Sequence, residues 1–409
     1  MTEAYLVGGA RTPVGRYGGA LSSVRPDDLA ALTIRAAVER AGIDPSAVDE
    51  VIIGNANGAG EENRNVARMA WLLAGMPDTV PGITVNRLCA SGMSAIAMAA
   101  QMIKSGEADI VVAGGVESMS RAPWVMEKPT TAFAKPGATY DTSIGWRFPN
   151  PAFVSGELSR DGKATFSMPE TAEEVARVYG ISREDADAFS VRSHERALAA
   201  IAAGHFDEEI VPVEVHGRKG AVTIVDTDEG PRAGTTAEVL GKLRPVVAGG
   251  SVVTAGNASS LNDGASAIVV ASAAAVERFG LKPRARVLGG ASAGVAQEIM
   301  GMGPVPATRK LLERHGLSVE DLGAVELNEA FASQSLACVR ELGLDPEIVN
   351  RDGGAIALGH PLGSSGSRLI VTLLGRMERE LEAGEKRRLG LATMCVGVGQ
   401  GSALLIEAV

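Results

Sequence analysis

The stretch LVGGA at Leu6–Ala10 returns as VLGGA at Val287–Ala291, 281 residues further along the chain. A second match follows it, because ERAGI at Glu39–Ile43 corresponds to ERHGL at Glu313–Leu317, at an offset of 274 residues. The two offsets differ by seven residues, which is the length of one shortened loop. Matches that keep nearly one spacing predict that the chain is built from two related halves.

Each copy has the pattern of an α/β unit. A short β-branched run is followed by a long helical stretch, at Pro26–Ala41 in the first copy and Ala307–His315 in the second. Another strand-like run then leads into a small-residue turn, where Ser91-Gly92 corresponds to Ser365-Gly366 at the 274-residue offset. Strands that alternate with helices predict βαβ units and a largely parallel or mixed sheet.

The segment 121–250 has no counterpart in the second copy and holds nine of the 19 prolines. Its part from Thr171 to Gly204 has a helical pattern, whereas Glu127–Pro151 is irregular and rich in turn residues. A long insertion with structure of its own commonly serves binding or assembly. The sequence therefore predicts a first half at 1–120 plus 251–276, an inserted loop domain at 121–250, and a second half at 277–409.

Composition narrows the class of protein. The 409 residues are 45% hydrophobic and 22% charged, and the net charge is −10, opposite to what nucleic acid or an anionic membrane attracts. The N-terminus lacks a signal-peptide pattern, and no uninterrupted apolar stretch reaches about 18 residues. Three cysteines far apart, Cys89, Cys338 and Cys395, favour free thiols in a reducing compartment. We expect a cytoplasmic protein that binds neither nucleic acid nor membrane.

Cys89 is the first candidate for chemistry. It follows the strand-like Ile83–Val85 and opens the helical stretch Cys89–Ile96. Amides at a helix N-terminus lower a thiol pKa, so this position predicts a reactive thiolate. The alternative is a buried structural cysteine, which is the more common fate of a lone cysteine.

His360 is the second candidate. It lies in the glycine-dense turn Gly353–Gly363, at nearly the same place in the repeat as Cys89. Two halves related by a pseudo-twofold axis would bring the two turns toward one cleft, and histidine is the usual base that activates a cysteine. The alternative is a histidine whose hydrogen bonds are satisfied within the turn.

Cys395 follows the predicted strand Leu389–Ala392 in a stretch of alternating glycines, whose exposed N–H groups suit an oxyanion hole. Cys338 lies inside the helical Ala332–Leu342 and is expected in the core. No phosphate-binding loop and no paired Cys or His at metal-ligand spacing occurs in the sequence. These patterns disfavour nucleotide hydrolysis, hydride transfer and a structural metal.

Taken together, the Cys89 segment, Asn328–Ala332, Gly359–Gly363 and Cys395–Gly397 resemble the motifs of the thiolase family of acyl-CoA acyltransferases over essentially the whole chain. The resemblance implies a five-layered αβαβα core made of two βαβαβαββ halves, with a loop domain inserted in the first. It also implies coenzyme A as a co-substrate, no permanently bound cofactor or metal, and a homodimer or homotetramer.

The resemblance further assigns roles to single residues. Cys89 is the nucleophile that becomes acylated, His360 takes its proton, and Cys395 moves the proton at C2 of the acetyl group. Asn328 holds a water that forms one oxyanion hole with His360, and the N–H groups of Cys89 and Gly397 form the second. The implied coenzyme A contacts are Met168, Arg218, Ala255, Ser259, Met300 and Phe331.

Three segments, Gly60–Met69, Asp141–Pro151 and Ser167–Thr171, are more closely similar to 3-oxoadipyl-CoA thiolases, which form succinyl-CoA and acetyl-CoA. Phe153–Phe166 departs from that pattern. Arg147 is then the expected partner of the terminal carboxylate of the substrate.

Four alternatives remain. An acetoacetyl-CoA thiolase and a broad-range 3-ketoacyl-CoA thiolase share the same motifs. A decarboxylating ketoacyl synthase shares the fold but pairs its cysteine with two histidines or with histidine and asparagine, so Cys395 disfavours it. A non-catalytic acyl-CoA or lipid carrier is the most distant alternative.

Overall fold

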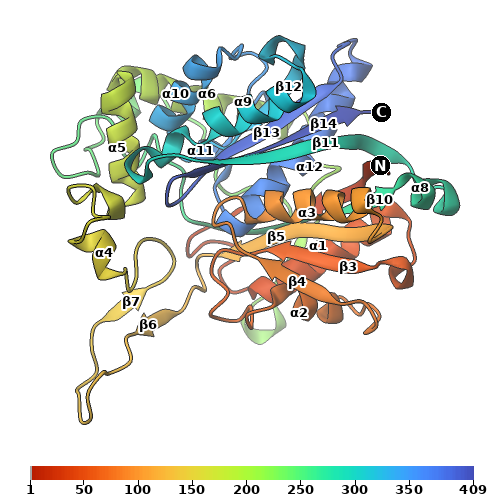
Figure 1. Cartoon of the computed structure of the whole chain (residues 1–409), viewed down its shortest axis with the longest axis horizontal. Helices are drawn as coiled ribbons and strands as arrows, with labels where there is room; N and C mark the ends of the chain where they lie inside the picture. The colour runs from red at the N-terminus through yellow and green to blue at the C-terminus, as the bar shows by residue number, and fades with distance from the viewer. Residues whose placement is uncertain (1) are drawn as a thin grey trace.

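Ten strands hydrogen-bond into one sheet in the computed structural model, which describes residues 2–409 (Figure 1). The strands of the first half are β1 (Ala4–Arg11), β2 (Gly15–Arg16), β3 (Glu50–Gly54), β4 (Gly82–Val85), β5 (Ile110–Ser118) and β10 (Asn262–Ser272). Those of the second half are β11 (Pro283–Gly294), β12 (Leu322–Leu327), β13 (Leu389–Val396) and β14 (Gln400–Ala408). Their order is β12-β13-β14-β11-β1-β10-β5-β3-β4, with β2 on β10, so β1 and β11 join the halves.

Helices cover the sheet in three layers. They are α1 (Pro26–Ala41), α2 (Val66–Leu73), α3 (Ser91–Ser105), α8 (Ala273–Phe279), α9 (Pro304–His315), α10 (Ala332–Leu342), α11 (Ala355–Leu358) and α12 (Leu362–Glu382). One core cluster joins α1 and α2 to the first half, and another joins α9 and α10 to the second. The central helices lie between the two halves of the sheet, because Ile96 of α3 and Leu373 of α12 share a cluster with strand residues of both halves. The two halves of the sheet therefore form two strand layers, with one helix layer between them and one on each outer side, which confirms the five-layered prediction.

The two halves differ in one strand. The first follows the predicted order completely, as β1-α1-β3-α2-β4-α3-β5 and, after the insertion, β10. In the second half, the third strand is reduced to a single parallel bridge between Val325 and Val349. The repeat therefore sets the architecture, and the second half has a shortened version of it.

The central helices α3 and α12 cross at the glycines of the repeated pair. A Cβ atom on Gly92 would lie 2.8 Å from Gly363 O, and one on Gly366 would lie 2.5 Å from Met93 N. Real Cβ atoms essentially never approach a backbone this closely, so any side chain here would separate the helices. This contact brings the starts of both helices, and the turns before them, to one place.

The segment between β5 and β10 packs on both halves. Its elements are β6 (Trp124–Met126), β7 (Thr139–Asp141), α4 (Pro151–Val154), α5 (Met168–Tyr179), α6 (Arg183–Ala202), β8 (Val213–His216), β9 (Val222–Val225) and α7 (Ala237–Gly241). Of these, α5 and α6 pack against the second half and the β8–β9 hairpin packs against the first. The helical stretch predicted at Thr171–Gly204 is two helices, because Gly180 ends α5 in the left-handed conformation. The β6–β7 hairpin extends away from the body (Figure 1), and Phe133 at its tip is fully exposed.

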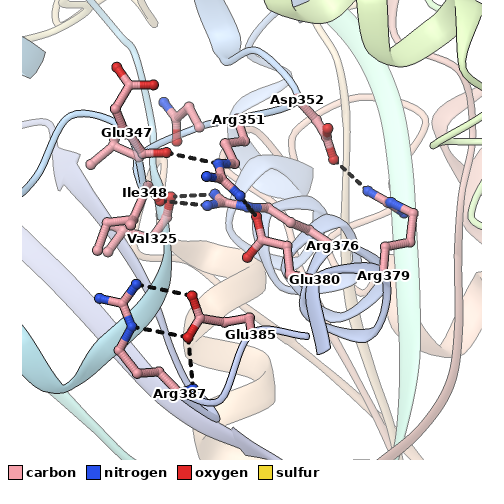
Figure 2. A network of polar contacts seen from close by, with 12 residues as sticks. Val325, Glu347, Ile348, Arg351, Asp352, Arg376, Arg379, Glu380, Glu385 and Arg387 are labelled. Carbon is pink, nitrogen blue, oxygen red and sulfur yellow. Dashed lines mark hydrogen bonds and ion pairs between the residues drawn. The ribbon is translucent and has the colours of Figure 1, made fainter. Parts of the chain in front are cut away.

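A polar network anchors α12 and the loop that leads to His360 (Figure 2). Arg376 of α12 donates hydrogen bonds to the carbonyl oxygens of Ile348 (2.7 Å) and Val325 (3.2 Å) and pairs with Glu380 (2.8 Å). One turn on, Arg379 pairs with Asp352 at 2.5 Å. Since Arg376 is almost fully buried, these contacts fix the helix against β12 and its following loop.

No helix within residues 2–409 is both long and apolar enough to span a bilayer. Likewise, no group of three or more His, Cys, Asp or Glu side chains in the described part of the chain is arranged to hold a metal ion.

Candidate active site

Cys89 lies in a strained turn rather than in the first turn of a helix. The sequence predicted that Cys89 opens the helix, but α3 begins at Ser91, two residues later. Leu88, just before the cysteine, has a φ of +47°, a left-handed conformation that a branched side chain rarely adopts. The Ser91 hydroxyl holds this turn, since it donates to Leu88 O (2.6 Å) and accepts from Arg87 N (2.9 Å).

The thiol of Cys89 is a weaker acid than the sequence suggested. Burial raises its pKa to about 11, although the backbone N–H groups of Gly397 and of Cys89 itself act in the opposite direction. The negative charge of the nearby Glu117 raises the pKa further. The prediction of a thiolate favoured by the helix start is therefore wrong, because desolvation outweighs the amides. The thiol needs a base to become a nucleophile.

Cys89 opens onto a cavity of about 330 Å³. Its walls come from both halves and from the insertion, and they include Asn57, Cys89, Glu117, Thr142, Trp146, Arg147, Met168, Leu362, Gly397 and Val398. The Arg147 guanidinium donates to Asn57 Oδ1 at 3.3 Å, and Asn57 donates in turn to the Thr142 hydroxyl at 2.9 Å. The structure thus brings Arg147, Met168 and Gly397 together around Cys89, as the sequence suggested.

His360 is held as a neutral imidazole. It is 5% exposed, and its Nδ1 lies 2.6 Å from the Ser365 hydroxyl. That hydroxyl donates its single proton to Pro361 O (2.9 Å), so it accepts from Nδ1–H and leaves Nε2 as the basic nitrogen. Burial, and then the charge of Arg368, lower the pKa of His360 to about 3. His360 is therefore neutral at neutral pH, and its Nε2 carries no proton.

Asn328 lies directly after β12, beside the His360 ring. Its backbone N–H donates to Thr393 O at 3.0 Å, and its Nδ2 lies 3.4 Å from His360 Nε2. The Oδ1 atom is buried and has no hydrogen-bond partner within residues 2–409. A buried carbonyl oxygen of this kind is satisfied by a water or by a ligand. This is the feature that a water-holding asparagine needs.

Cys395 is buried inside β13, at 1% exposure. The sequence predicted that this strand ends at Ala392, but it continues to Val396, so the cysteine belongs to the strand. Burial, and then the neighbouring Cys89, raise the pKa of Cys395 well above its usual value. The two thiols are thus close enough to influence each other, and both are neutral in the resting site.

Several residues expected to contact coenzyme A surround Cys395. Met300 and Phe331 share its small buried cluster, and Met168 packs against that cluster from the cavity side. Ser259 is tied to the same region, because its N–H donates to Ala330 O at 2.9 Å. Met168 thereby lies between the Cys89 cavity and the Cys395 cluster.

Ala255 lines a second cavity of about 320 Å³, together with Arg16, His194, Arg232 and Ser260. Arg218, in contrast, lies in the short turn Arg218–Gly220 between β8 and β9 and is exposed. Two arginines, Arg16 and Arg232, line this cavity together with Ala255, and the sequence analysis singled out neither.

Two further polar residues were missed. Ser365 orients His360. The sequence feature that could have predicted this contact is a hydroxyl residue one turn into the helix that follows the histidine. Glu117 lines the Cys89 cavity, and its signal is a single acidic residue in the otherwise uncharged strand Ile110–Ser118. A lone charged side chain in a fully buried strand needs polar partners, so such a residue indicates a specific contact.

Models of known families match nearly the whole chain. The thiolase N-terminal domain matches residues 4–274, and the thiolase C-terminal domain matches residues 281–408. Together they cover both halves and the insertion.

Individual proteins are similar over their full length. A beta-ketoadipyl-CoA thiolase of Pseudomonas aeruginosa is 58% identical over 100% of this chain and 99% of its own. A 3-oxoadipyl-CoA/3-oxo-5,6-dehydrosuberyl-CoA thiolase of Escherichia coli is 52% identical, with 100% of both chains covered. The crystal structure of the Bacillus anthracis acetyl-CoA acetyltransferase superposes with a TM-score of 0.92 at 42% identity, covering 100% of this chain and 99% of that one.

Proposed function

Because the chain belongs to the thiolase family of acyltransferases, we propose that it cleaves 3-oxoadipyl-CoA with coenzyme A into succinyl-CoA and acetyl-CoA. The observation that carries the substrate class is Arg147, a cation on the wall of the Cys89 cavity. The names of the full-length relatives at 52% and 58% identity support the same substrate.

The first half-reaction uses both halves of the core. His360 Nε2 takes the proton of Cys89 as the sulfur attacks C3 of the substrate, and the C2–C3 bond then breaks. The negative charge on the acetyl-CoA enolate is stabilised by His360 and by a water held on Asn328. Cys395 donates a proton to C2, acetyl-CoA leaves, and a succinyl group remains on Cys89.

The second half-reaction returns the acyl group to coenzyme A. The thiol of coenzyme A attacks the succinyl thioester, and the N–H groups of Cys89 and Gly397 receive the charge on the carbonyl oxygen. Those two N–H groups act on the Cys89 sulfur in the resting site, which supports their position at the reacting centre. The Cys395 thiolate accepts the proton of coenzyme A, the bond between the acyl carbon and the Cys89 sulfur breaks, His360 returns its proton to that sulfur, and succinyl-CoA leaves.

Arg147 is assigned to the terminal carboxylate of the succinyl part. Its guanidinium lies in the cavity that opens at Cys89, where Nη2 donates to Asn57 Oδ1 at 3.3 Å and Nη1 donates to Gly145 O at 3.5 Å. The N–H groups not used in these two long contacts can face a carboxylate, and a charge-assisted pair with it contributes about 1.5 to 3 kcal/mol. An unsubstituted acetoacetyl chain cannot form this pair.

The pantetheine arm of coenzyme A is assigned to the surface around Met168, Met300 and Phe331. Flexible methionine side chains suit such an arm, and these three lie at the Cys395 cluster. The phosphates are assigned to Arg16 and Arg232, which line the second cavity beside Ala255. The coenzyme A contact expected at the exposed Arg218 stays a separate prediction.

We also propose a homo-oligomer formed at β4. This strand is at one end of the sheet order, and Ile83 on it is 44% exposed. The adjacent α2 exposes Met69, Leu72 and Leu73. The outer edge of such a strand, which has no neighbouring strand in the sheet, and the exposed apolar side chains beside it form a surface on which a second copy can pack. Analytical ultracentrifugation of an Ile83→Lys variant should show a shift toward monomer.

The substrate proposal is tested by kcat/KM for three compounds: 3-oxoadipyl-CoA, acetoacetyl-CoA and a long apolar 3-oxoacyl-CoA. We expect the highest value for 3-oxoadipyl-CoA. A preference for acetoacetyl-CoA would favour an acetoacetyl-CoA thiolase, and a preference for the long chain would favour a broad-range 3-ketoacyl-CoA thiolase. No cleavage of any of them would favour a carrier.

A further inference from the structure

We propose that Glu117 is a positioning residue that holds the His360 turn of the second half against the half that carries Cys89. The inference rests on the proposed roles of Cys89 and His360, and it concerns how the two groups are kept in register. The buried carboxylate of Glu117 takes no part in the reaction steps proposed for Cys89 and His360.

Glu117 lies near the end of β5 and is 2% exposed. Its Oε2 accepts the N–H of Gly363 at 2.9 Å and the N–H of Ala56 at 2.8 Å, and its Oε1 accepts the N–H of Asn57 at 3.1 Å. Gly363 belongs to the second half, whereas Ala56 and Asn57 belong to the first and line the cavity. One carboxylate therefore ties the wall of the cavity to the segment directly after His360.

The bond to Gly363 has a particular value for α12. The first N–H groups of a helix have no partner within it, and the residue before α12, Pro361, provides no side-chain cap. A carboxylate at a helix N-terminus supplies that partner and also interacts favourably with the helix dipole. Glu117 thus acts as a cap that comes from the other half of the molecule.

The backbones at this junction are in contact, so the cap fixes a position and not merely a distance. A Cβ atom on Gly115 would lie 2.0 Å from Gly363 O, and a Cβ atom on Gly363 would lie 2.4 Å from Val116 O. His360 precedes Gly363 by three residues and is tied to α12 through Ser365. A shift of the helix start would therefore move the imidazole relative to Cys89.

If Glu117 acted only through its charge, its removal would have the opposite effect on the reactivity of Cys89. Glu117 and Cys89 line the same cavity, and the charge of Glu117 opposes formation of the thiolate. If charge were all that mattered, its removal would make Cys89 more reactive. If position matters, its removal separates the thiol from its base and makes Cys89 less reactive.

The test is the rate at which iodoacetamide alkylates Cys89 in the folded, full-length protein at pH 7. Glu117→Gln keeps the shape but replaces one accepting oxygen with a donor. We expect alkylation to be about 10- to 100-fold slower, the scale of a displaced catalytic group. In thiolysis, kcat should fall while KM for coenzyme A changes less than about twofold. An unchanged or faster alkylation rate would overturn the proposal.

Three companion variants separate the possible failures. Asp49→Asn is the matched control, because the Asp49 carboxylate also accepts two backbone N–H groups, those of Asp109 and Ile110, but at the opposite end of β5, and the alkylation rate of this variant should stay at the wild-type value. Gly363→Ala should slow alkylation like Glu117→Gln, since its methyl group would displace the turn, and a wild-type rate would overturn the proposal. If His360→Ala alkylates at the wild-type rate, the proposed base itself is wrong. If only His360→Ala is slow, the inference about Glu117 alone fails.

Discussion

The turn before α3 and the turn before α12 occupy similar places in the two halves, yet one holds a thiol and the other an imidazole. Cys89 and His360 each lie two residues before the helix that follows. Cys89 is partly accessible, whereas His360 is enclosed. The duplicated scaffold thus presents different chemical groups from equivalent turns, and the proposed mechanism uses the thiol as proton donor and the imidazole as acceptor.

Burial acts on the two groups in the same chemical sense. It raises the pKa of Cys89 to about 11 and lowers the pKa of His360 to about 3, so each neutral form is favoured. Both directions favour a neutral thiol and a neutral imidazole over an ion pair. Under the proposed mechanism, the nucleophile then forms during the attack on substrate, when the oxyanion holes can offset the new charge.

The largest expected effect is on the first half. Cys89→Ala should lower kcat on the order of 10⁴- to 10⁶-fold, the scale seen when a covalent nucleophile is removed. Thiolysis of 3-oxoadipyl-CoA measures it. Cys338→Ala is the matched control, because Cys338 lies on the buried face of α10 in the second-half core cluster. This substitution should lower stability more than turnover. Comparable losses for both variants would contradict the assignment.

The corresponding change in the second half should have a smaller effect. His360→Ala should lower kcat by about 10²- to 10⁴-fold, the usual contribution of a general base, while the thiol remains in place. Raising the pH toward the pKa of Cys89 should partly restore acylation of this variant, because hydroxide then removes the proton. A loss of activity that does not depend on pH would contradict the role of His360 as the base.

Arg147→Ala tests whether the insertion adds substrate selectivity to the shared core. We expect kcat/KM for 3-oxoadipyl-CoA to fall by about 10- to 100-fold, which corresponds to the lost charge-assisted pair. The value for acetoacetyl-CoA should change little, and the comparison of the two substrates is the internal control. Equal losses for both substrates would mean that Arg147 supports the cavity wall through Asn57.

The smallest effect is on stability. The pKa of His360 in the folded protein is lowered, so between its ordinary value of about 6.5 and about 3 the unfolded chain binds a proton that the folded chain does not. Stability is therefore lost as the pH falls through this range, by up to about 1.4 kcal/mol per pH unit. In urea unfolding at pH 7.5 and 5.0, His360→Gln should lose less stability between the two pH values than the wild type. An equal loss would contradict the enclosed neutral histidine.

The sequence predicted the architecture well because the repeat and its helical periods are local patterns. It misplaced the start of α3, since Ala90 at the cap position makes no side-chain bond and gives no signal. It ended β13 too early, at Ala392, although the strand continues through Cys395. In both places the local pattern is weak and tertiary packing decides the boundary.

The missed site residues act through contacts between distant segments. Glu117 bonds to Gly363, 246 residues away, and Ser365 bonds to the ring of His360 only because of how the turn before α12 folds. Their roles depend on geometry that no local pattern contains.

The central claim is that the two thiols have separate roles, and the Cys395→Ala variant tests it most directly. Incubated with acetyl-CoA in deuterated buffer, it should still form acetyl-Cys89, visible as an acetyl mass increment. It should no longer exchange the C2 hydrogens of acetyl-CoA for deuterium. Retention of the acetyl adduct with loss of exchange is the predicted result; exchange at the wild-type rate would show that Cys395 does not move the C2 proton.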